Sequence, residues 1–226
     1  MKEKKYGLRQ ITTAAMFAAM AYVVALICHF VMPPLVEMPP LKLDLKDAVI
    51  AIAGMMLGPI PAAAISLIVS LLEMLTISST GPIGMLMNVL STCSFVCTAS
   101  FIYKKKRTKG GAVVGLAAGA AAMVLAMLLW NYIVTPFYQG VPREAVAALL
   151  LHVFLPFNAV KAGLNMAITL LLYKPLVSVI RKIRPEPVSD ASGAAGPHKI
   201  SIGVYILGGA LLVTSVLFAL ALAKVI

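Results

Sequence analysis

The sequence predicts an all-α integral membrane protein, and three observations support this: its hydropathy, its low charge content and the length of its apolar runs. Of the 226 residues, 61% are hydrophobic and 12% are charged, whereas soluble domains carry roughly 25% charged residues. The mean hydropathy is +0.98. One membrane-spanning helix needs about 20 apolar residues, so the chain is long enough for several spans and is not a soluble globular protein.

Six spans are expected, followed by one further apolar run. The spans end at proline, glycine or charged residues, and proline cannot continue a helix without losing a hydrogen bond. The stretch 41–47 alternates apolar and polar residues and is expected to be extended. We expect a loop at 135–142 and a short amphipathic surface helix at 143–152. The expected spans cover roughly residues 11–32, 48–57, 62–77, 85–103, 112–134 and 157–180, with the further run at 200–223.

The chain is expected to have three parts. Residues 1–184 form a six-helix membrane domain that contains the binding site. Residues 185–199 are a flexible linker, because they mix Pro, Ser, Gly and Ala without periodicity. Residues 200–226 form an additional C-terminal transmembrane helix.

The net charge of +11 indicates how the chain is oriented. Of the 19 Lys and Arg residues, 13 lie in the N-terminal arm, in the 104–109 loop and in the stretch 174–184, which share one side if six spans alternate. The opposite side has Lys42, Lys46 and Arg143. Because cytoplasmic loops are enriched in Lys and Arg, the N-terminus is expected in the cytoplasm. The charge therefore reports topology, and we expect no nucleic-acid binding.

Polar side chains within the spans are the candidates for function. Lys161 follows Asn158 by three residues, which puts both on one helix face. A lysine at the centre of the membrane costs about 2.5–3.5 kcal/mol, so it needs a cavity or a carboxylate, unless it reaches the interface. Asn131 either binds a ligand or bonds a neighbouring helix. Glu73 either pairs with Lys161 or is solvated at the boundary.

Asn88, Asn131, Asn158 and Lys161 fall in the outward halves of three spans and suggest one polar pocket that opens outwards. An asparagine amide offers a donor and an acceptor side by side, which suits the imide or amide edge of a heterocycle. Four aromatic residues either add a flat apolar wall or form an interfacial belt. They are Trp130, Tyr132, Phe137 and Tyr138.

No catalytic or metal-binding motif is found. Cys93 and Cys97 share a helix face without a histidine or carboxylate at ligand spacing, so they are interpreted as core residues. The sequence has no phosphate-binding loop, no nucleophile elbow and no His-Glu-x-x-His motif. We therefore expect no enzyme activity, no metal site and no cofactor.

Four stretches carry a resemblance to a known family. They are Leu-Lys-Leu-Asp-Leu-Lys-Asp at 41–47, Ser-Ser-Thr-Gly at 78–81 followed by Asn88, Asn131-Tyr132 with Pro136, and Leu-Pro-Phe-Asn at 155–158 with Lys161. Over about residues 8–182 the chain resembles the substrate-binding S component of energy-coupling-factor (ECF) vitamin transporters, and among these the riboflavin-specific type.

The resemblance implies a six-helix protein of the bacterial cell membrane that binds riboflavin from outside, as a transported ligand rather than a cofactor. It also implies a membrane-embedded coupling subunit and two cytoplasmic ATPases as partners. Small-residue repeats in the first helix would contact the coupling subunit, here at Ala14, Ala15, Ala18 and Ala19. By motif position, the substrate site comprises Leu41, Lys42, Asp44, Thr80, Gly81, Asn88, Asn131, Asn158 and Lys161.

Other functions remain open on the residues alone. The chain could be an S component for folate or thiamine. A stand-alone channel or secondary transporter is the alternative in another class, although no intramembrane carboxylate–histidine relay or internal repeat is evident. A membrane enzyme would need a nucleophile–base pair, which is missing.

Overall fold

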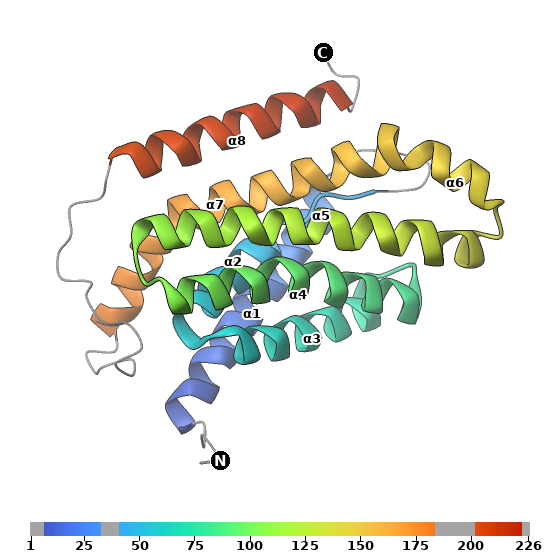
Figure 1. Ribbon diagram of the computed structural model, residues 1–226. Helices are drawn as coiled ribbons and strands as arrows, with labels where there is room; N and C mark the ends of the chain where they lie inside the picture. Colours follow the sequence, from blue (N-terminus) through green and yellow to red (C-terminus); the bar gives the residue numbers. More distant parts are fainter. Residues whose placement is uncertain (1–6, 33–40, 184–201, 223–226) are drawn as a thin grey trace.

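The computed structural model describes residues 7–32, 41–183 and 202–222 (Figure 1). These residues form eight α-helices and one π-helical turn, without a β-strand in the described ranges. Six helical stretches are long and apolar enough to cross a membrane, and the predicted all-α membrane class is confirmed. These six include the C-terminal helix, whereas the expected span at 48–57 is not among them. The elements are α1 Leu8–Val31, α2 Lys46–Leu57, α3 Pro59–Thr76, α4 Gly81–Lys105, α5 Lys109–Gln139, α6 Arg143–Leu149, the π-helical turn Leu150–Phe154, α7 Leu155–Ile183 and α8 Ile202–Leu222.

Helix α2 is a half-length helix in the middle of the bundle. Its 12 residues span about 18 Å, which is too short for hydrocarbon about 30 Å thick. Helices α1, α3, α4 and α7 pack against it. Every residue from Lys46 to Met55 is buried, which explains why the run is apolar on all sides. Gly58, with φ of 102°, supplies a positive φ that glycine adopts without steric cost and that lets the chain turn directly into α3.

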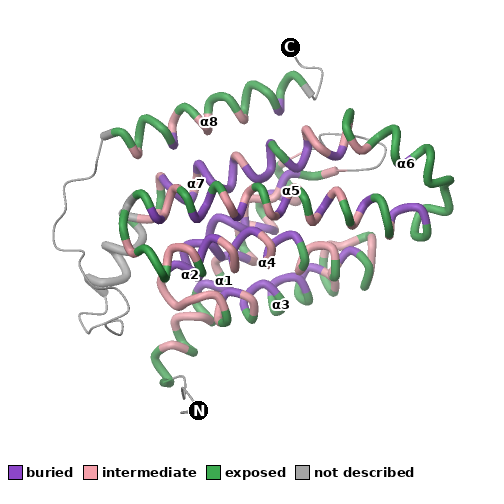
Figure 2. Tube along the Cα trace, in the orientation of Figure 1, coloured by how far each residue is buried: buried purple, intermediate pink, exposed green. Residues whose placement is uncertain are grey.

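The inward faces of the helices are buried, as the purple stretches in Figure 2 show, and most of their apolar residues form one main core. Phe17, Phe95 and Leu116 are completely buried in it. Helices α4 and α5 approach closely, since a Cβ atom on Gly119 would lie 2.4 Å from the Phe95 carbonyl oxygen. The glycine-rich start of α5 thus allows the close helix contact that small residues permit in membranes.

Three expected boundaries are wrong. The stretch expected to be extended to residue 47 is non-helical only as far as Leu45, and Lys46 already begins α2. Helix α5 continues through Pro136 to Gln139, where a loop was expected, and ends at Gly140 with a left-handed φ of 65°. The surface helix expected at 143–152 is not a separate element. Helix α6 ends at Leu149, and the π-helical turn joins it to α7 without a break. Tertiary packing overrides the local proline signal here, because a helix in a bundle tolerates an internal proline.

Helix α8 is the additional C-terminal helix that the sequence predicts, and it lies along α7 on the outside of the bundle (Figure 1). The expected linker at 185–199 lies outside the described residues, so the proposed division of the chain into three parts stays a prediction.

Candidate binding cavity

A cavity of about 240 Å³ lies between α1, the extended segment 41–45, the α3–α4 turn and helices α4, α5 and α7. This volume is just below the roughly 300–1,000 Å³ of typical small-molecule sites. Eight of the nine predicted substrate-site residues line it, namely Leu41, Lys42, Asp44, Thr80, Asn88, Asn131, Asn158 and Lys161. The ninth, Gly81, does not line the cavity but begins α4 beside Thr80.

Lys161 lies inside the bundle and has a carboxylate partner. It is 8% exposed, which excludes the alternative that its ammonium group reaches the interface. Its Nζ atom lies 3.9 Å from Oδ2 of Asp47, while Oδ1 of Asp47 accepts a 2.7 Å hydrogen bond from Thr92. Asp47 is completely buried, so the ammonium group compensates a charge at the start of α2.

Glu73 pairs with Lys46 and neither pairs with Lys161 nor lies in solvent. The Lys46 Nζ atom donates to Oε1 of Glu73 at 2.7 Å and lies 2.7 Å from Oδ2 of Asp44. Asn88 adds a 3.2 Å hydrogen bond to the other oxygen of Glu73. Lys46 is 1% exposed. Sequence reasoning counted Lys46 among the cations of an outer loop and missed that a helix begins there.

The charges at Asp44 and Lys46 stabilise each other. Burial alone would raise the pKa of the Asp44 carboxyl, but the ammonium groups of Lys46 and Lys161 outweigh burial and hold this pKa below its ordinary value. The Asp44 carboxylate also accepts a 2.9 Å hydrogen bond from the Lys46 backbone N–H. A carboxylate at a helix N-terminus is favourable, so Asp44 stays ionised beside the cavity.

Asn165 ties the extended segment to α2, although it is not among the predicted site residues. Its Nδ2 donates to the Asp44 carbonyl oxygen at 2.8 Å, and its Oδ1 accepts from the Ala48 backbone N–H at 2.8 Å. The signal that could have indicated this role is its place one helical turn after Lys161, on the same face.

Asn131 and Asn158 anchor their amides to their own helices. Each Nδ2 donates to a backbone carbonyl four residues earlier at 2.7 Å, in Met127 and Phe154 respectively. Neither amide bonds a neighbouring helix, as one interpretation of Asn131 had suggested. The Asn131 oxygen accepts from Thr135, whereas the Asn158 oxygen has no partner within the described part of the chain. The Asn158 oxygen is therefore open to a ligand.

Of the two interpretations of the four aromatic residues on α5, the one that makes them a wall of the cavity is wrong, because none of them lines it. Trp130 packs against the apolar core, and Tyr132, Phe137 and Tyr138 are exposed on α5. Because Asn131 faces inward, its neighbour Tyr132 points about 100° away around the helix. Phe157 on α7 lines the cavity instead.

Five charged groups converge beside the cavity: Asp44, Asp47 and Glu73 as carboxylates and Lys46 and Lys161 as ammonium groups. Each of them has a charged partner, which is how buried charges are usually accommodated. Across the described residues, no group of three His, Cys, Asp or Glu side chains is arranged to hold a metal ion. This arrangement suits the binding of a polar, largely uncharged molecule.

The alanine pairs on α1 differ in exposure. Ala18 is 6% exposed, and Ala14 packs against the apolar core. Ala15 and Ala19 are exposed one helical turn apart. Ala18 therefore faces the protein's own core, and the pair available to a partner is Ala15 and Ala19.

Membrane-length helices around a cavity lined by both apolar and polar side chains define a membrane protein that binds a solute in its interior. The match to a family model narrows this class further. Residues 9–173 match the family "ECF transporter, substrate-specific component", and the chain belongs to that family. It is thus a transporter component that binds substrate and is not an enzyme.

The curated relatives share the name riboflavin transporter. The riboflavin transporter RibU of Staphylococcus aureus (strain TCH60) is 30% identical over 182 residues, which is 77% of this chain and 94% of the relative. The riboflavin transporter FmnP of Bacillus subtilis (strain 168) is 27% identical over 68% of this chain and 84% of its own length.

A solved structure described as the S component of a bacterial ECF transporter superposes with a TM-score of 0.64 at 29% identity. The match covers 76% of this chain and 98% of that one. The predicted S-component fold is therefore confirmed. Helix α8 begins after the residues that the family model matches.

Proposed function

We propose that this chain binds riboflavin in the cavity between α4, α5 and α7 and delivers it for import across the membrane. The observation that carries the proposal is the convergence of Asn131, Asn158, Lys161 and Asp44 on one cavity, in a chain whose curated relatives are named riboflavin transporters. An isoalloxazine ring carries an imide edge and ring nitrogens that complement amide and ammonium groups.

The cavity chemistry supports a specific division of roles. Lys161 would donate from its ammonium group, and the open oxygen of Asn158 would accept from the ring imide. Asn131 is held by Met127 and Thr135, so it would present a fixed amide with little loss of side-chain entropy on binding. Leu41 and Phe157 would contact the apolar faces of the ring.

Import requires partners, which we infer to be a membrane-embedded coupling subunit and two cytoplasmic ATPases. The exposed pair Ala15 and Ala19 on α1 supports a close helix contact with the coupling subunit, because small residues let backbones approach in lipid. The flanking α1 residues Ile11 and Val23 are 56% and 51% exposed, so the pair lies within an apolar stripe.

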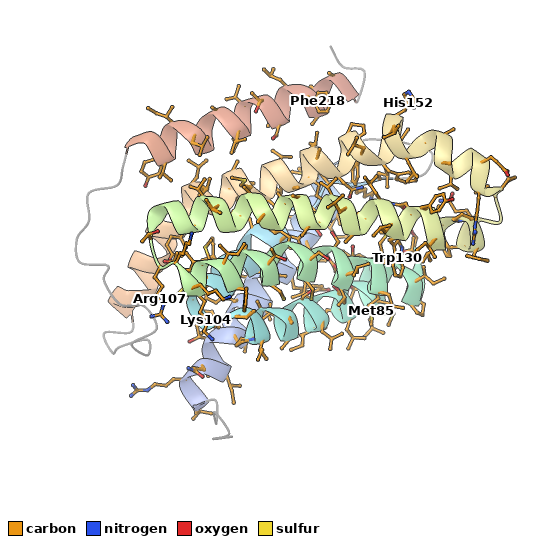
Figure 3. The ribbon with its side chains drawn as sticks, viewed as in Figure 1. Met85, Lys104, Arg107, Trp130, His152 and Phe218 are labelled. Carbon is orange, nitrogen blue, oxygen red and sulfur yellow. The ribbon has the colours of Figure 1, made fainter. Side chains whose placement is uncertain are left out.

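We further propose that the N-terminus is cytoplasmic and that the cavity opens to the outside of a bacterial cell membrane. Lys104 and Arg107 lie at the end of the bundle opposite Trp130 (Figure 3), and Trp130 adjoins the cavity residue Asn131. The basic residues that favour the cytoplasmic side are thus at the end remote from the cavity.

The direct test is to purify the full chain and record its absorbance and its quenching of riboflavin fluorescence. We expect a yellow preparation with a flavin spectrum, or complete quenching by the ligand-free protein in a one-to-one titration. Folate and thiamine titrated by calorimetry serve as controls for the other vitamins. A colourless protein that leaves riboflavin fluorescence unchanged contradicts the proposal.

A further inference from the structure

Helix α8 is built to contact α7 closely. A Cβ atom on Gly208 would lie 3.1 Å from a methyl group of Leu171, and one on Gly163 would lie 2.7 Å from the Ser215 hydroxyl oxygen. The small residues Gly208 on α8 and Gly163 on α7 thus allow the two helices to approach. Helix α8 therefore packs closely against α7 at two places along its length. It is also long and apolar enough to cross the membrane.

The far end of α8 reaches the wall of the cavity. Ala219, 8% exposed, belongs to a small buried cluster with Leu43 of the extended segment and with three residues of α7. The α7 members are Phe157, Val160 and Leu164. This cluster is separate from the main apolar core, so the buried partners of Leu43 in it come from α7 and α8, with Met32 at the end of α1 packed against the cluster.

The segment 41–45 belongs both to the cluster with Ala219 and to the wall of the cavity. Leu43 is a member of that cluster, and Leu41 and Leu45 pack against it, while Leu41, Lys42, Leu43 and Asp44 all line the cavity. Because Asp44 follows Leu43 directly in the chain, the position of Leu43 in its cluster constrains the position of Asp44. Any displacement of Leu43 moves Asp44 relative to Lys46 and to the ligand.

We propose that α8 is a positioning element for the binding site: through Ala219 it holds Leu43 and the extended segment in place over the cavity and so slows ligand release. Only the choice of riboflavin as the ligand depends on the function proposed above. Its physical content, that α8 controls how firmly the segment closes the cavity, is independent of which molecule binds.

The first test compares two full-chain variants on one helical turn of α8. Ala219→Trp overfills the Leu43 cluster, whereas Ala221→Trp adds the same side chain at an exposed position. With riboflavin we expect the dissociation rate of Ala219→Trp to rise at least fivefold, with the association rate little changed. Ala221→Trp should match the wild type.

A second readout needs no ligand. Cys28 lines the cavity, is 4% exposed and lies beside the Leu45 backbone. In a background with Cys93→Ala and Cys97→Ala, we expect iodoacetamide to alkylate Cys28 several times faster with Ala219→Trp than with Ala221→Trp. If wild-type protein does not bind riboflavin but this difference is found, the proposed function fails and the role of α8 stands.

An independent pair of variants covers the case in which Ala219→Trp does not fold. Gly208→Leu pushes α8 away from Leu171, whereas Gly209→Leu points into open space. Faster release and faster Cys28 alkylation in Gly208→Leu alone would support the proposal. Equal rates in both members of each folded pair, or a lowered melting temperature without a change in either rate, would overturn it.

Discussion

The interior of the helix bundle is packed differently in two regions, the contact between α4 and α5 and the region around Lys46 and Lys161. Where α4 and α5 cross near Gly119 and Phe95, the interior is dry and the backbones nearly touch. Around Lys46 and Lys161 the interior instead holds five charged groups and a cavity. Lys46, Asp47 and Lys161 are as deeply buried as the apolar residues of the other half, so the difference does not follow from exposure to water.

The tight packing of α4 against α5 compensates the energetic cost of the polar half around Lys46 and Lys161. A cavity contributes no dispersion contacts, and charges removed from water lose their hydration. Close contacts between α4 and α5, made through glycine, supply packing that is insensitive to the ligand. The polar half is stabilised by ion pairs and is completed when a ligand fills the cavity.

The strongest way to break the polar half is Lys46→Met. This change leaves the Asp44 and Glu73 carboxylates buried beside each other without their shared partner, and removing one member of a buried pair costs about 3–5 kcal/mol. We expect a large fall in melting temperature or loss of folded protein. Lys42→Met, at an exposed position, is the control, and equal stability of the two variants would contradict the importance of the Lys46 cluster.

The dry half is probed by Gly119→Ala. The added methyl group meets the Phe95 carbonyl oxygen, a backbone atom that cannot move alone, and overpacking of this kind costs about 1–3 kcal/mol. Thermal unfolding should show the loss, while riboflavin affinity of the folded protein stays near that of the wild type. Gly110→Ala has open space around the new Cβ and should be at least as stable as the wild type.

Ligand affinity should respond to the cavity residues rather than to the dry core. We expect Lys161→Ala and Asn131→Ala each to weaken riboflavin binding at least tenfold, or about 1.4 kcal/mol, in fluorescence titrations. Tyr132→Ala, on the exposed face of the same helix as Asn131, provides the matched control. Unchanged titrations for both cavity variants would refute the assignment of this cavity as the riboflavin site.

The smallest expected effect concerns pH. Because the pKa of Asp44 is lowered in the folded protein, its contribution is fully present above the ordinary value of about 4 and is lost as the pH falls through the lowered pKa. Asp44→Asn should therefore reduce stability by about 1 kcal/mol equally at pH values of about 6 and about 8. If the stability difference between the wild type and Asp44→Asn were present at the higher pH and lost at the lower one, Asp44 would titrate in that range.

Much of this protein can be predicted from local patterns. Hydropathy and run length predict the membrane-length helices, since one apolar helix needs no knowledge of its neighbours. The stretch with period-two alternation is non-helical as far as Leu45, and polar residues at membrane depth indicate the cavity because their cost demands a partner. Lys161 and Asn158 are examples in which a single costly residue identifies the right region.

Pairing and orientation depend on contacts between residues far apart in the chain. Lys46 and Glu73 are 27 positions apart, and only the seating of α2 between α1, α3, α4 and α7 brings them together. The rotation of α5 turns Asn131 towards the cavity and its aromatic neighbours away from it, and the place of α8 against Leu43 follows from helix packing. These features are set by which faces of the helices meet, and a one-dimensional pattern of polarity does not contain that choice.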